Sequence, residues 1–427
     1  MKVCVLGLWH LGTVTAACLA SGGHEVTGLD FDPEAIRRLQ AGQPPLFEPG
    51  LEDLVKSGLE QKRLRFTNDI AYALDGAQIV WVTYDTPVDE QDRASVEFVI
   101  ERVARLFPHL GVNTLVIISS QLPVGTTHRL EQICRAVNPD KSITFAYSPE
   151  NLRLGKALDV FRQPDRVVIG NRSEMDKSKI TALFQPFTER LEWMSVESAE
   201  MTKHAVNAFL AVSVTFANEI AVLCEQVGAD AKEVERGLKS EARIGPKAYL
   251  SPGAAFAGGT LARDIMFLTQ IGEQANQPTH LLSSVKISND THKRWTARKL
   301  NSLLGALNGR HVAVWGLTYK PGTDTLRRSS SVELCSWLAK QGVHVLAHDP
   351  AVRSLPDDLS GEFILCDTPL SSLHATEWPE YRSLTAEMVL SVAKNLTVID
   401  PGRFLANTLG RDSRIRYVSV GSLPHSK

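Results

Sequence analysis

The sequence predicts an α/β protein with two doubly wound domains, joined by a long central helix and a helical middle domain. Three observations predict this fold. Short apolar runs alternate with helical patterns towards both ends of the chain, and one long helical pattern separates the two alternating regions. The third is length, because 427 residues exceed one ordinary hydrophobic core. We expect domains at 1–195, 196–295 and 296–427.

The N-terminal region begins with a strand, turn, helix and strand. An apolar run from Lys2 to Leu6 ends at Gly7, small residues from Gly12 to Ala20 predict a helix, and Glu25 to Asp30 predicts a second strand. Further strands are expected at Ile79–Thr83, Leu115–Ser119, Thr144–Tyr147 and Arg166–Ile169. Such alternation is typical of a mostly parallel Rossmann-like sheet.

The middle and the C-terminal part follow a different order. Apolar residues recur every three and four positions from Ser198 to Val227, which predicts one long helix. Alternation then resumes, and we expect a second Rossmann-like domain. Its predicted strands are His311–Leu317, His344–His348, Phe363–Cys366, Leu396–Ile399 and Arg416–Val420, with a helix over Val332–Gln341.

Composition narrows the class of protein. With 46 Lys and Arg against 48 Asp and Glu, the net charge of −2 gives no support for a nucleic-acid or membrane-surface partner. The six cysteines form no C-x-x-C pair, as expected for reduced thiols in the cytoplasm. The apolar N-terminus resembles a secretory signal, but Gly7, His10 and Gly12 interrupt it. No other apolar stretch of about twenty residues is expected, and we expect a cytoplasmic protein without a metal site.

The turn after the first strand carries part of a dinucleotide-binding pattern. It reads Gly7-Leu8-Trp9-His10-Leu11-Gly12, so Trp9 replaces the middle glycine that lets a pyrophosphate approach the backbone. Asp30 ends the second strand, where a carboxylate binds the adenosine ribose and repels a 2′-phosphate. The turn therefore favours NAD over NADP. The alternative is that both glycines only allow strand–helix packing in a domain without a dinucleotide.

Ordered motifs run along nearly the whole chain. They include DFDPEAIRRLQAGQPPLFEPGLEDLV from Asp30, Thr86-Pro87, PVGTT from Pro123, SPENLRLGKALD from Ser148, AEMTKHAVNAFLA from Ala199, PGAAFAGG from Pro252 and GLTYKPGTDTLRRSSS from Gly316. With these motifs the chain resembles the UDP-glucose and GDP-mannose dehydrogenase family from Met1 to about Gly421. The resemblance implies oxidation of the sugar's C6 hydroxyl by NAD, first to an aldehyde and then, through a cysteine thiohemiacetal, to an acid.

The resemblance also implies roles for catalytic residues. Lys203 and Asn207 match the family's lysine and asparagine, and their spacing places both on one helix face. Asp264 matches the aspartate that holds a reactive water, and Glu150 matches a glutamate near the sugar. Taken alone, Lys203 reads as a solvated helix lysine. Glu150 reads nearly as well as a helix-start carboxylate at a Ser-Pro turn.

Binding residues are carried over in the same way. The cofactor set implied by the match is Gly7, Trp9, Leu11, Gly12, Asp30, Thr86, Pro87 and Gln121, where Gln121 replaces a family threonine. The set implied for the nucleotide sugar is Arg243, Gly253, Gly258, Lys320 and Arg327. The alternative for Lys320 and Arg327 is that they only pair with neighbours such as Asp324.

The departures from the family lie where its second oxidation takes place. The segment from Gly258 to Asp264 contains no cysteine and carries Arg263 for the family's lysine, and Leu154 replaces a second glutamate. Two functions remain open. One is an NAD-linked oxidoreductase limited to a single or a transient, epimerase-like oxidation; the other is an inactive protein that binds or senses a nucleotide sugar. TEWPEY from Thr376 favours a UDP-sugar, and the long helix favours a homodimer.

Overall fold

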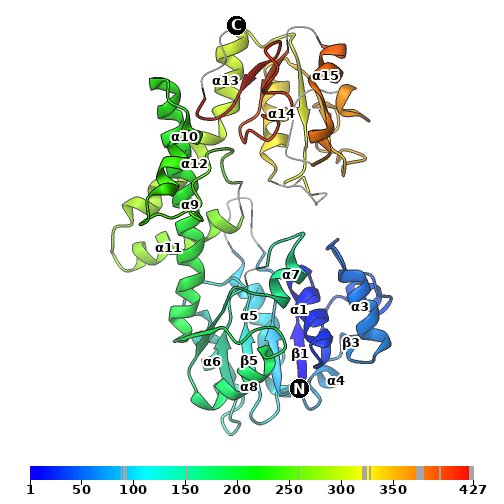
Figure 1. The fold of residues 1–427 in the computed structure, drawn as a ribbon. Coiled ribbons are helices and arrows are strands. Elements are labelled where there is room, and N and C mark those ends of the chain that lie inside the picture. The colour runs from blue at the N-terminus through cyan, green and yellow to red at the C-terminus, as the bar shows by residue number, and fades with distance from the viewer. Residues whose placement is uncertain are drawn as a thin grey trace. The chain divides into compact units, whose positions relative to one another are not determined.

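The computed structural model describes residues 1–87, 89, 94–150, 152–257, 259–319, 325–326, 328–371, 379–393 and 396–422 (Figure 1). The chain divides into two compact units, Met1–Ala205 and Val206–Lys427. The long helix α9 (Val196–Val227) contributes residues to both units. The three domain boundaries expected from the sequence stay a prediction.

The first unit is built on one eight-stranded sheet in the order β3-β2-β1-β4-β5-β6-β7-β8. Its strands are β1 Lys2–Leu6, β2 Glu25–Leu29, β3 Leu64–Thr67, β4 Ile79–Val82, β5 Leu115–Ile118, β6 Thr144–Tyr147, β7 Val167–Asn171 and β8 Leu191–Met194. All neighbours are parallel except β6 and β7, which are antiparallel. The predicted parallel-dominated α/β fold is confirmed. β3 and β8, which were not predicted, are four-residue edge strands with only partial burial.

Helices cover both faces of this sheet, because alternate side chains of each strand point to opposite faces. Val3 and Val5 of β1 join one buried cluster, whereas Cys4 and Leu6 join the other. The helices of this unit are α1 His10–Ser21, α2 Pro33–Gln40, α3 Leu51–Glu60, α4 Ile70–Leu74, α5 Val96–Ala104, α6 Thr126–Val137, α7 Ala157–Arg162 and α8 Glu174–Phe184. A short 3₁₀ turn covers Phe107–His109.

The strand order reverses direction between β1 and β4, since β2 and β3 lie on one side and β5 to β8 on the other. In open parallel sheets, ligands bind at the carboxyl ends of the strands beside such a switch point. The glycine-rich turn after β1 and the segments after β4 and β5 meet at this edge. The sheet topology therefore places the predicted cofactor residues of the first unit at one location.

The second unit begins with a helical part. Residues of α9 from Ala208 onwards pack with α11 (Thr260–Gln274) and α12 (His280–Lys293), and Ala208, Ile265 and Val285 form the centre of this contact. The remaining helices of this part are α10 Ala231–Ser240 and α13 Trp295–Leu304. A second cluster, which includes Ala221, joins the end of α9 to the α/β part that follows.

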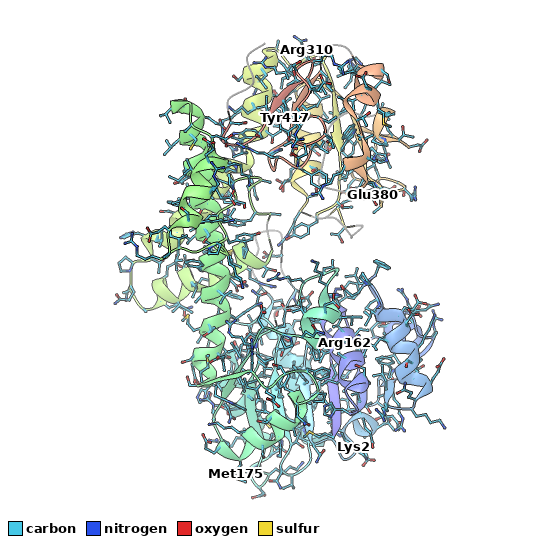
Figure 2. The ribbon with its side chains drawn as sticks, viewed as in Figure 1. Lys2, Arg162, Met175, Arg310, Glu380 and Tyr417 are labelled. Atoms are coloured by element: carbon cyan, nitrogen blue, oxygen red, sulfur yellow. The ribbon has the colours of Figure 1, made fainter. Side chains whose placement is uncertain are left out.

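The α/β part of the second unit contains two small parallel sheets, β11-β10-β9 and β12-β13. The strands are β9 His311–Trp315, β10 His344–His348, β11 Ile364–Leu365, β12 Thr397–Ile399 and β13 Arg416–Val418, and the helices are α14 Ser330–Lys340 and α15 Ala386–Val392. Short 3₁₀ turns cover Pro369–Ser371 and Pro379–Ser383. Tyr417 of β13 is buried in this α/β part (Figure 2), and its hydroxyl donates to Asp400. The predicted resumption of strand–helix alternation is confirmed.

Helix α9 requires one correction. Within the described ranges, it is the one helix that is long and apolar enough to cross a membrane by length and composition. The expectation that no stretch beyond the N-terminus has this length is therefore wrong. Half of its most apolar window is buried, and a core helix passes the same test.

Candidate functional site

The turn after β1 requires glycine at both ends. Gly7 has a φ of +92°, which favours glycine, and a side chain there would lie 2.8 Å from the Tyr84 ring. A Cβ on Gly12 would lie 1.7 Å from the carbonyl oxygen of Gly7. This contact brings the first turn of α1 against the end of β1, as in dinucleotide-binding turns.

Asp30 is connected directly to this turn. Its Oδ2 accepts from the Leu8 N–H at 2.7 Å, and its Oδ1 accepts from the Asp32 N–H at 3.1 Å. Asp30 follows β2, which pairs with β1 in parallel register from Lys2–Glu25 to Leu6–Leu29. The carboxylate therefore lies beside the glycine-rich turn, where the sequence predicts the cofactor ribose.

Trp9 does not fill the turn. Trp9 is 51% exposed and is the N-cap residue of α1, but its side chain makes no capping hydrogen bond. The amides of the first turn of α1 have no acidic side chain among them, which suits an anionic group at that helix end. Leu11 is half-buried and lines a small apolar pocket with Thr15 and Trp81.

The other predicted cofactor residues follow neighbouring strands. The Thr86 hydroxyl, after β4, donates to the Gln121 carbonyl, after β5, at 2.8 Å. Gln121 is buried, whereas Pro87 is exposed and its carbonyl accepts from the Ser95 N–H at 2.8 Å. Because β4 and β5 are adjacent and parallel, the structure brings Thr86 and Gln121 together at the edge that also holds Gly7.

Lys203 is a buried lysine rather than a solvated one. Its residue is 8% exposed, and its Nζ donates to the Glu150 carbonyl at 2.6 Å and lies 3.7 Å from Glu150 Oε1. The Glu150 carboxylate also accepts from the Leu152 N–H at 2.8 Å. The structure thus joins two of the predicted catalytic residues, and it holds the ammonium group of Lys203 in one place.

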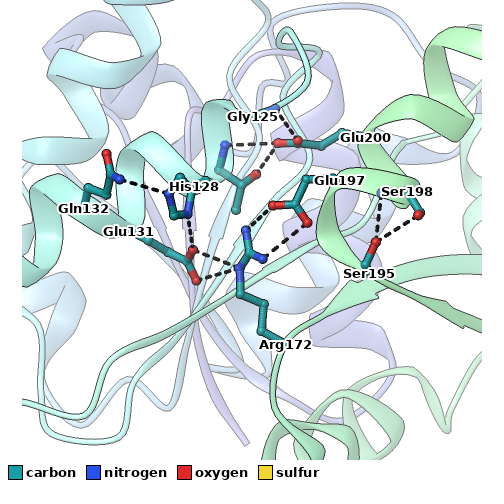
Figure 3. A network of polar contacts seen from close by, with 10 residues as sticks. Gly125, His128, Glu131, Gln132, Arg172, Ser195, Glu197, Ser198 and Glu200 are labelled. Carbon is teal, nitrogen blue, oxygen red and sulfur yellow. Dashed lines mark hydrogen bonds and ion pairs between the residues drawn. The ribbon is translucent and has the colours of Figure 1, made fainter.

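Two neighbours of Lys203 on α9, Glu200 and His204, anchor this part of the helix, and Figure 3 shows the contacts of Glu200. The buried Glu200 carboxylate accepts from the Gly125 N–H at 2.6 Å and from the Thr127 N–H and hydroxyl at 3.0 and 2.6 Å. Buried His204 donates from Nε2 to the Leu122 carbonyl at 3.0 Å. The segment from Leu122 to Thr127 is therefore held against α9 by residues on both sides of Lys203.

A cluster of ion pairs near the surface adds further contacts between the start of α9 and the first unit (Figure 3). Arg172 donates to Glu197 at 2.6 Å and contacts Glu131 at 2.9 Å. The hydrogen bond from Arg172 holds the pKa of Glu197 below its usual value. Glu197 and Glu200 lie about one turn apart on α9, so both carboxylates tie the start of this helix to the first unit.

Asn207 and Asp264 form a second pair, within the second unit. The Asn207 side-chain amide donates to Asp264 Oδ2, and Asp264 is 0% exposed at the start of α11. Asn207 follows Lys203 by four residues on α9, so the two side chains project from one helix face as predicted.

The second unit contains a pocket of about 470 Å³, a size typical of ligand sites. It is lined by Ala254, Ala255 and Ala257 of the PGAAFAGG segment, by Thr318, Tyr319 and Ser329–Ser331, and by Asp400, Pro401 and Gly402, among others. Two motifs that the sequence assigns to the nucleotide sugar therefore meet at one concave surface.

Of the residues predicted to bind the nucleotide sugar, the structure places one next to the pocket and one on the surface. Gly253 precedes the pocket residue Ala254, and its N–H donates to Asn218 Oδ1 at 2.9 Å. Arg243 is exposed and donates to Glu241 at 2.9 Å, so in the free protein it makes a surface contact. Gly258, Lys320 and Arg327 lie outside the described residues.

Several polar residues that position these segments were not singled out in the sequence. Asn218, Asn289 and His292 bind the backbone of Gly253, Ala254 and Phe256, and they are buried on the inner faces of α9 and α12. A polar side chain on an otherwise apolar helix face was the available signal. Across the described part of the chain, no group of three or more His, Cys, Asp or Glu is arranged to hold a metal ion.

Comparison with protein families matches three parts of the chain. Residues 1–188 match the NAD binding domain of the UDP-glucose/GDP-mannose dehydrogenase family, residues 197–291 match its central domain, and residues 313–407 match its UDP binding domain. The glycine-rich turn lies within the first of these ranges, and most residues that line the 470 Å³ pocket lie within the second or the third.

Individual relatives extend over the same length. The UDP-glucose 6-dehydrogenase of Pseudomonas aeruginosa is 34% identical over 442 residues, covering 99% of this chain and 97% of the relative. That of Rhizobium meliloti is 33% identical over 439 residues, covering 99% of both. The structure of a UDP-glucose dehydrogenase from Pyrobaculum islandicum superposes with a TM-score of 0.89 at 30% identity, covering 99% of this chain and 98% of the other.

Proposed function

Because this chain belongs to the UDP-glucose/GDP-mannose dehydrogenase family, we propose that it oxidises a UDP-sugar with NAD once and does not complete the second oxidation. The predicted family, the NAD cofactor and the nucleotide-sugar dehydrogenase class are confirmed by these matches. The limit to one oxidation is our inference. It rests on the segment from Gly259 to Asp264, which holds Thr260 and Arg263 but no cysteine.

Loss of a hydride from C6 converts the alcohol into an aldehyde. The hydroxyl group must therefore lose its proton, and the negative charge that develops on its oxygen must be stabilised. When bound, NAD accepts the hydride. We assign Lys203 to stabilise the developing alkoxide, because its ammonium group is buried and already fixed by Glu150. Asn207 and Asp264 would hold the water that takes the proton, since their side chains are hydrogen-bonded to each other and buried.

We place the UDP group in the 470 Å³ pocket of the second unit. The hydroxyl groups of Ser329–Ser331 can donate to phosphate oxygens, and apolar residues such as Leu300 and Val314 suit the base and ribose. Asn218, Asn289 and His292 keep the PGAAFAGG segment at the rim in one conformation. These observations support a UDP-sugar, and they do not depend on the later redox chemistry.

The cysteines elsewhere are poor substitutes for the missing nucleophile. Five of the six are buried and the sixth is half-buried. Burial raises the pKa of Cys4, Cys18 and Cys335 to about 12, so these thiols stay protonated near neutral pH and are weak nucleophiles. The second oxidation needs a thiolate that adds to the aldehyde, and these three cysteines do not supply one.

The stoichiometry of NADH tests this proposal. Calorimetric titration with NAD and with UDP-glucose establishes which ligands bind, and the complex is then assayed for NADH and for the sugar product by mass spectrometry. We expect binding of both ligands and at most one NADH for each sugar, with an aldehyde as product. If the aldehyde is reduced again on the enzyme, NADH appears only transiently and the sugar is recovered.

Two results would overturn the proposal. Two NADH for each sugar, together with the uronic acid, would establish the complete four-electron oxidation. Binding of UDP-glucose without binding of NAD would instead support the second candidate, a nucleotide-sugar-binding protein on this scaffold. The observation behind this candidate is that Trp9 replaces the middle glycine of the dinucleotide-binding pattern.

We also propose that the protein is a homodimer through α9. Phe209, Phe216 and Leu223 are exposed and follow one another at intervals of seven residues, so they form one apolar stripe along the helix. A second copy can cover this stripe with its own, because two-fold interfaces are self-complementary.

Phe216→Asp should convert the dimer into a monomer, since it introduces a charge at the centre of the stripe. Light scattering after size-exclusion chromatography measures the mass. Met175→Asp is the control, because Met175 on α8 is exposed (Figure 2) but lies outside the stripe. A native protein that runs as a monomer, or a Phe216→Asp dimer, would contradict this interface.

A further inference from the structure

A buried carboxylate connects the glycine-rich turn to the loop that holds Lys203. Glu48 precedes α3 and is 4% exposed, although it contacts no Lys or Arg among the ion pairs of the described residues. The roles proposed above do not use it. A buried carboxylate is costly unless donors surround it, so its partners indicate what it does.

Glu48 accepts three hydrogen bonds from two segments. Its Oε2 accepts from His10 Nε2 at 2.9 Å and from the Gly155 N–H at 2.8 Å, and its Oε1 accepts from the Ala157 N–H at 2.8 Å. Gly155 has a φ of +85°, which directs its amide into this arrangement at little cost for glycine. One oxygen atom, Oε2, is therefore shared between His10 and the loop.

The two segments lead to different parts of the proposed chemistry. His10 is the first residue of α1, the helix whose N-terminus faces the pyrophosphate in dinucleotide-binding folds. Gly155 and Ala157 end the loop that begins at Glu150, and the Glu150 carbonyl binds Lys203 Nζ. Glu48 thus binds His10 at the cofactor turn and also binds the end of the segment whose first residue, Glu150, binds the lysine that we assign to catalysis.

We propose that Glu48 and His10 are positioning residues that couple occupancy of the cofactor turn to the order of the loop from Leu152 to Ala157. This inference rests on the proposed function, because it takes NAD as the ligand of the turn. A ligand that fixes the first turn of α1 also fixes His10, and the shared Oε2 then holds the Gly155 amide more rigidly. Cofactor binding would thereby order the loop that lies next to Glu150, the residue that holds Lys203.

Two substitutions of His10 separate the coupling from general stability. His10→Phe keeps an aromatic ring but removes the donor to Glu48, and leaves the two backbone donors to Glu48 in place. His10→Gln keeps a side-chain N–H that can donate to Glu48. His128→Gln is the control, because His128 on α6 is exposed and far along the chain from this contact.

Hydrogen–deuterium exchange of the Gly155 and Ala157 amides, with and without saturating NAD, tests the coupling. Calorimetry on the same samples measures NAD binding. In the native protein, His10→Gln and His128→Gln, we expect NAD to slow exchange of both amides at least about fivefold, at the lower end of typical coupling between sites. In His10→Phe, NAD should bind but change this exchange less than about twofold.

Each other outcome has a distinct meaning. NAD binding that leaves exchange of the two amides unchanged in the native protein would overturn this proposal and leave the proposed function intact. An equal effect of NAD in His10→Phe would do the same. Absence of NAD binding to the native protein would overturn the proposed oxidation, and the coupling with it.

Discussion

We expect that alanine in place of Lys203 lowers the rate of NADH formation on the enzyme at least about a hundredfold, the lower limit for loss of a group that stabilises a developing oxyanion. The reason is that the Lys203 ammonium group is buried and held by the Glu150 carbonyl at 2.6 Å. A water molecule that took its place would not be held in the same way and would stabilise the alkoxide less well. Single-turnover absorbance at the NADH wavelength measures the rate whether or not the aldehyde is later reduced.

The control for Lys203→Ala is Lys56→Ala. Lys56 is an exposed lysine on α3 that pairs with Glu52, and its loss should leave the rate within twofold. Calorimetry should show that Lys203→Ala still binds NAD, because its partner Glu150 lies outside the glycine-rich turn. A Lys203→Ala rate within threefold of the native rate would show that this lysine does not take part in the oxidation.

Gly12→Ala has the largest expected effect on stability. The new Cβ would lie 1.7 Å from the Gly7 carbonyl oxygen and 2.6 Å from Thr83 Oγ1, and neither the backbone nor a hydroxyl bound to Leu6 and Gly7 can move away freely. We expect a loss of about 3 kcal/mol in the free energy of unfolding of the first unit, at the upper end for overpacking. NAD binding should be lost as well, because α1 must shift from β1.

A matched substitution isolates the clash. Gly237→Ala lies on α10, where nothing stands within 4 Å of the added carbon, and should stabilise its helix by up to about 1 kcal/mol. Urea unfolding followed by fluorescence and circular dichroism measures both variants. An unchanged unfolding midpoint and native NAD affinity for Gly12→Ala would mean that the turn does not have the close strand–helix contact described above.

The elements that could be predicted are those whose signal is local. β1, β6 and β10 begin and end at the predicted residues, because each is a short apolar run bounded by turn or polar residues. The long helix was predicted to within two residues at its start, since its apolar periodicity persists over many turns. β3 and β8 were missed because four-residue edge strands carry too few buried residues to show a period.

The candidate site divides in the same way. Gly7 and Asp30 could be named from the spacing of the dinucleotide-binding pattern, whereas Lys203 and Asp264 were named from the family resemblance. The supporting residues could not be named. Glu200 reaches Thr127 across 73 positions of the chain, and Glu48 reaches Ala157 across 109, so no local pattern links the partners.

The amino-acid sequence thus specified the order of most elements and the parallel α/β class, since periodicity is a property of neighbouring residues, and its motifs named the side chains that we propose for catalysis. The tertiary structure decided which side chains are buried and held. Taken alone, Lys203 reads as a solvated helix residue, but the structure shows that Glu150 binds it, and Glu48, for which the sequence predicted no role, is surrounded by His10, Gly155 and Ala157. Hydrogen bonds between distant segments form only when the strands pair and the helices pack on the sheet. Their energies depend on how deeply the partners are buried, which sequence spacing does not encode.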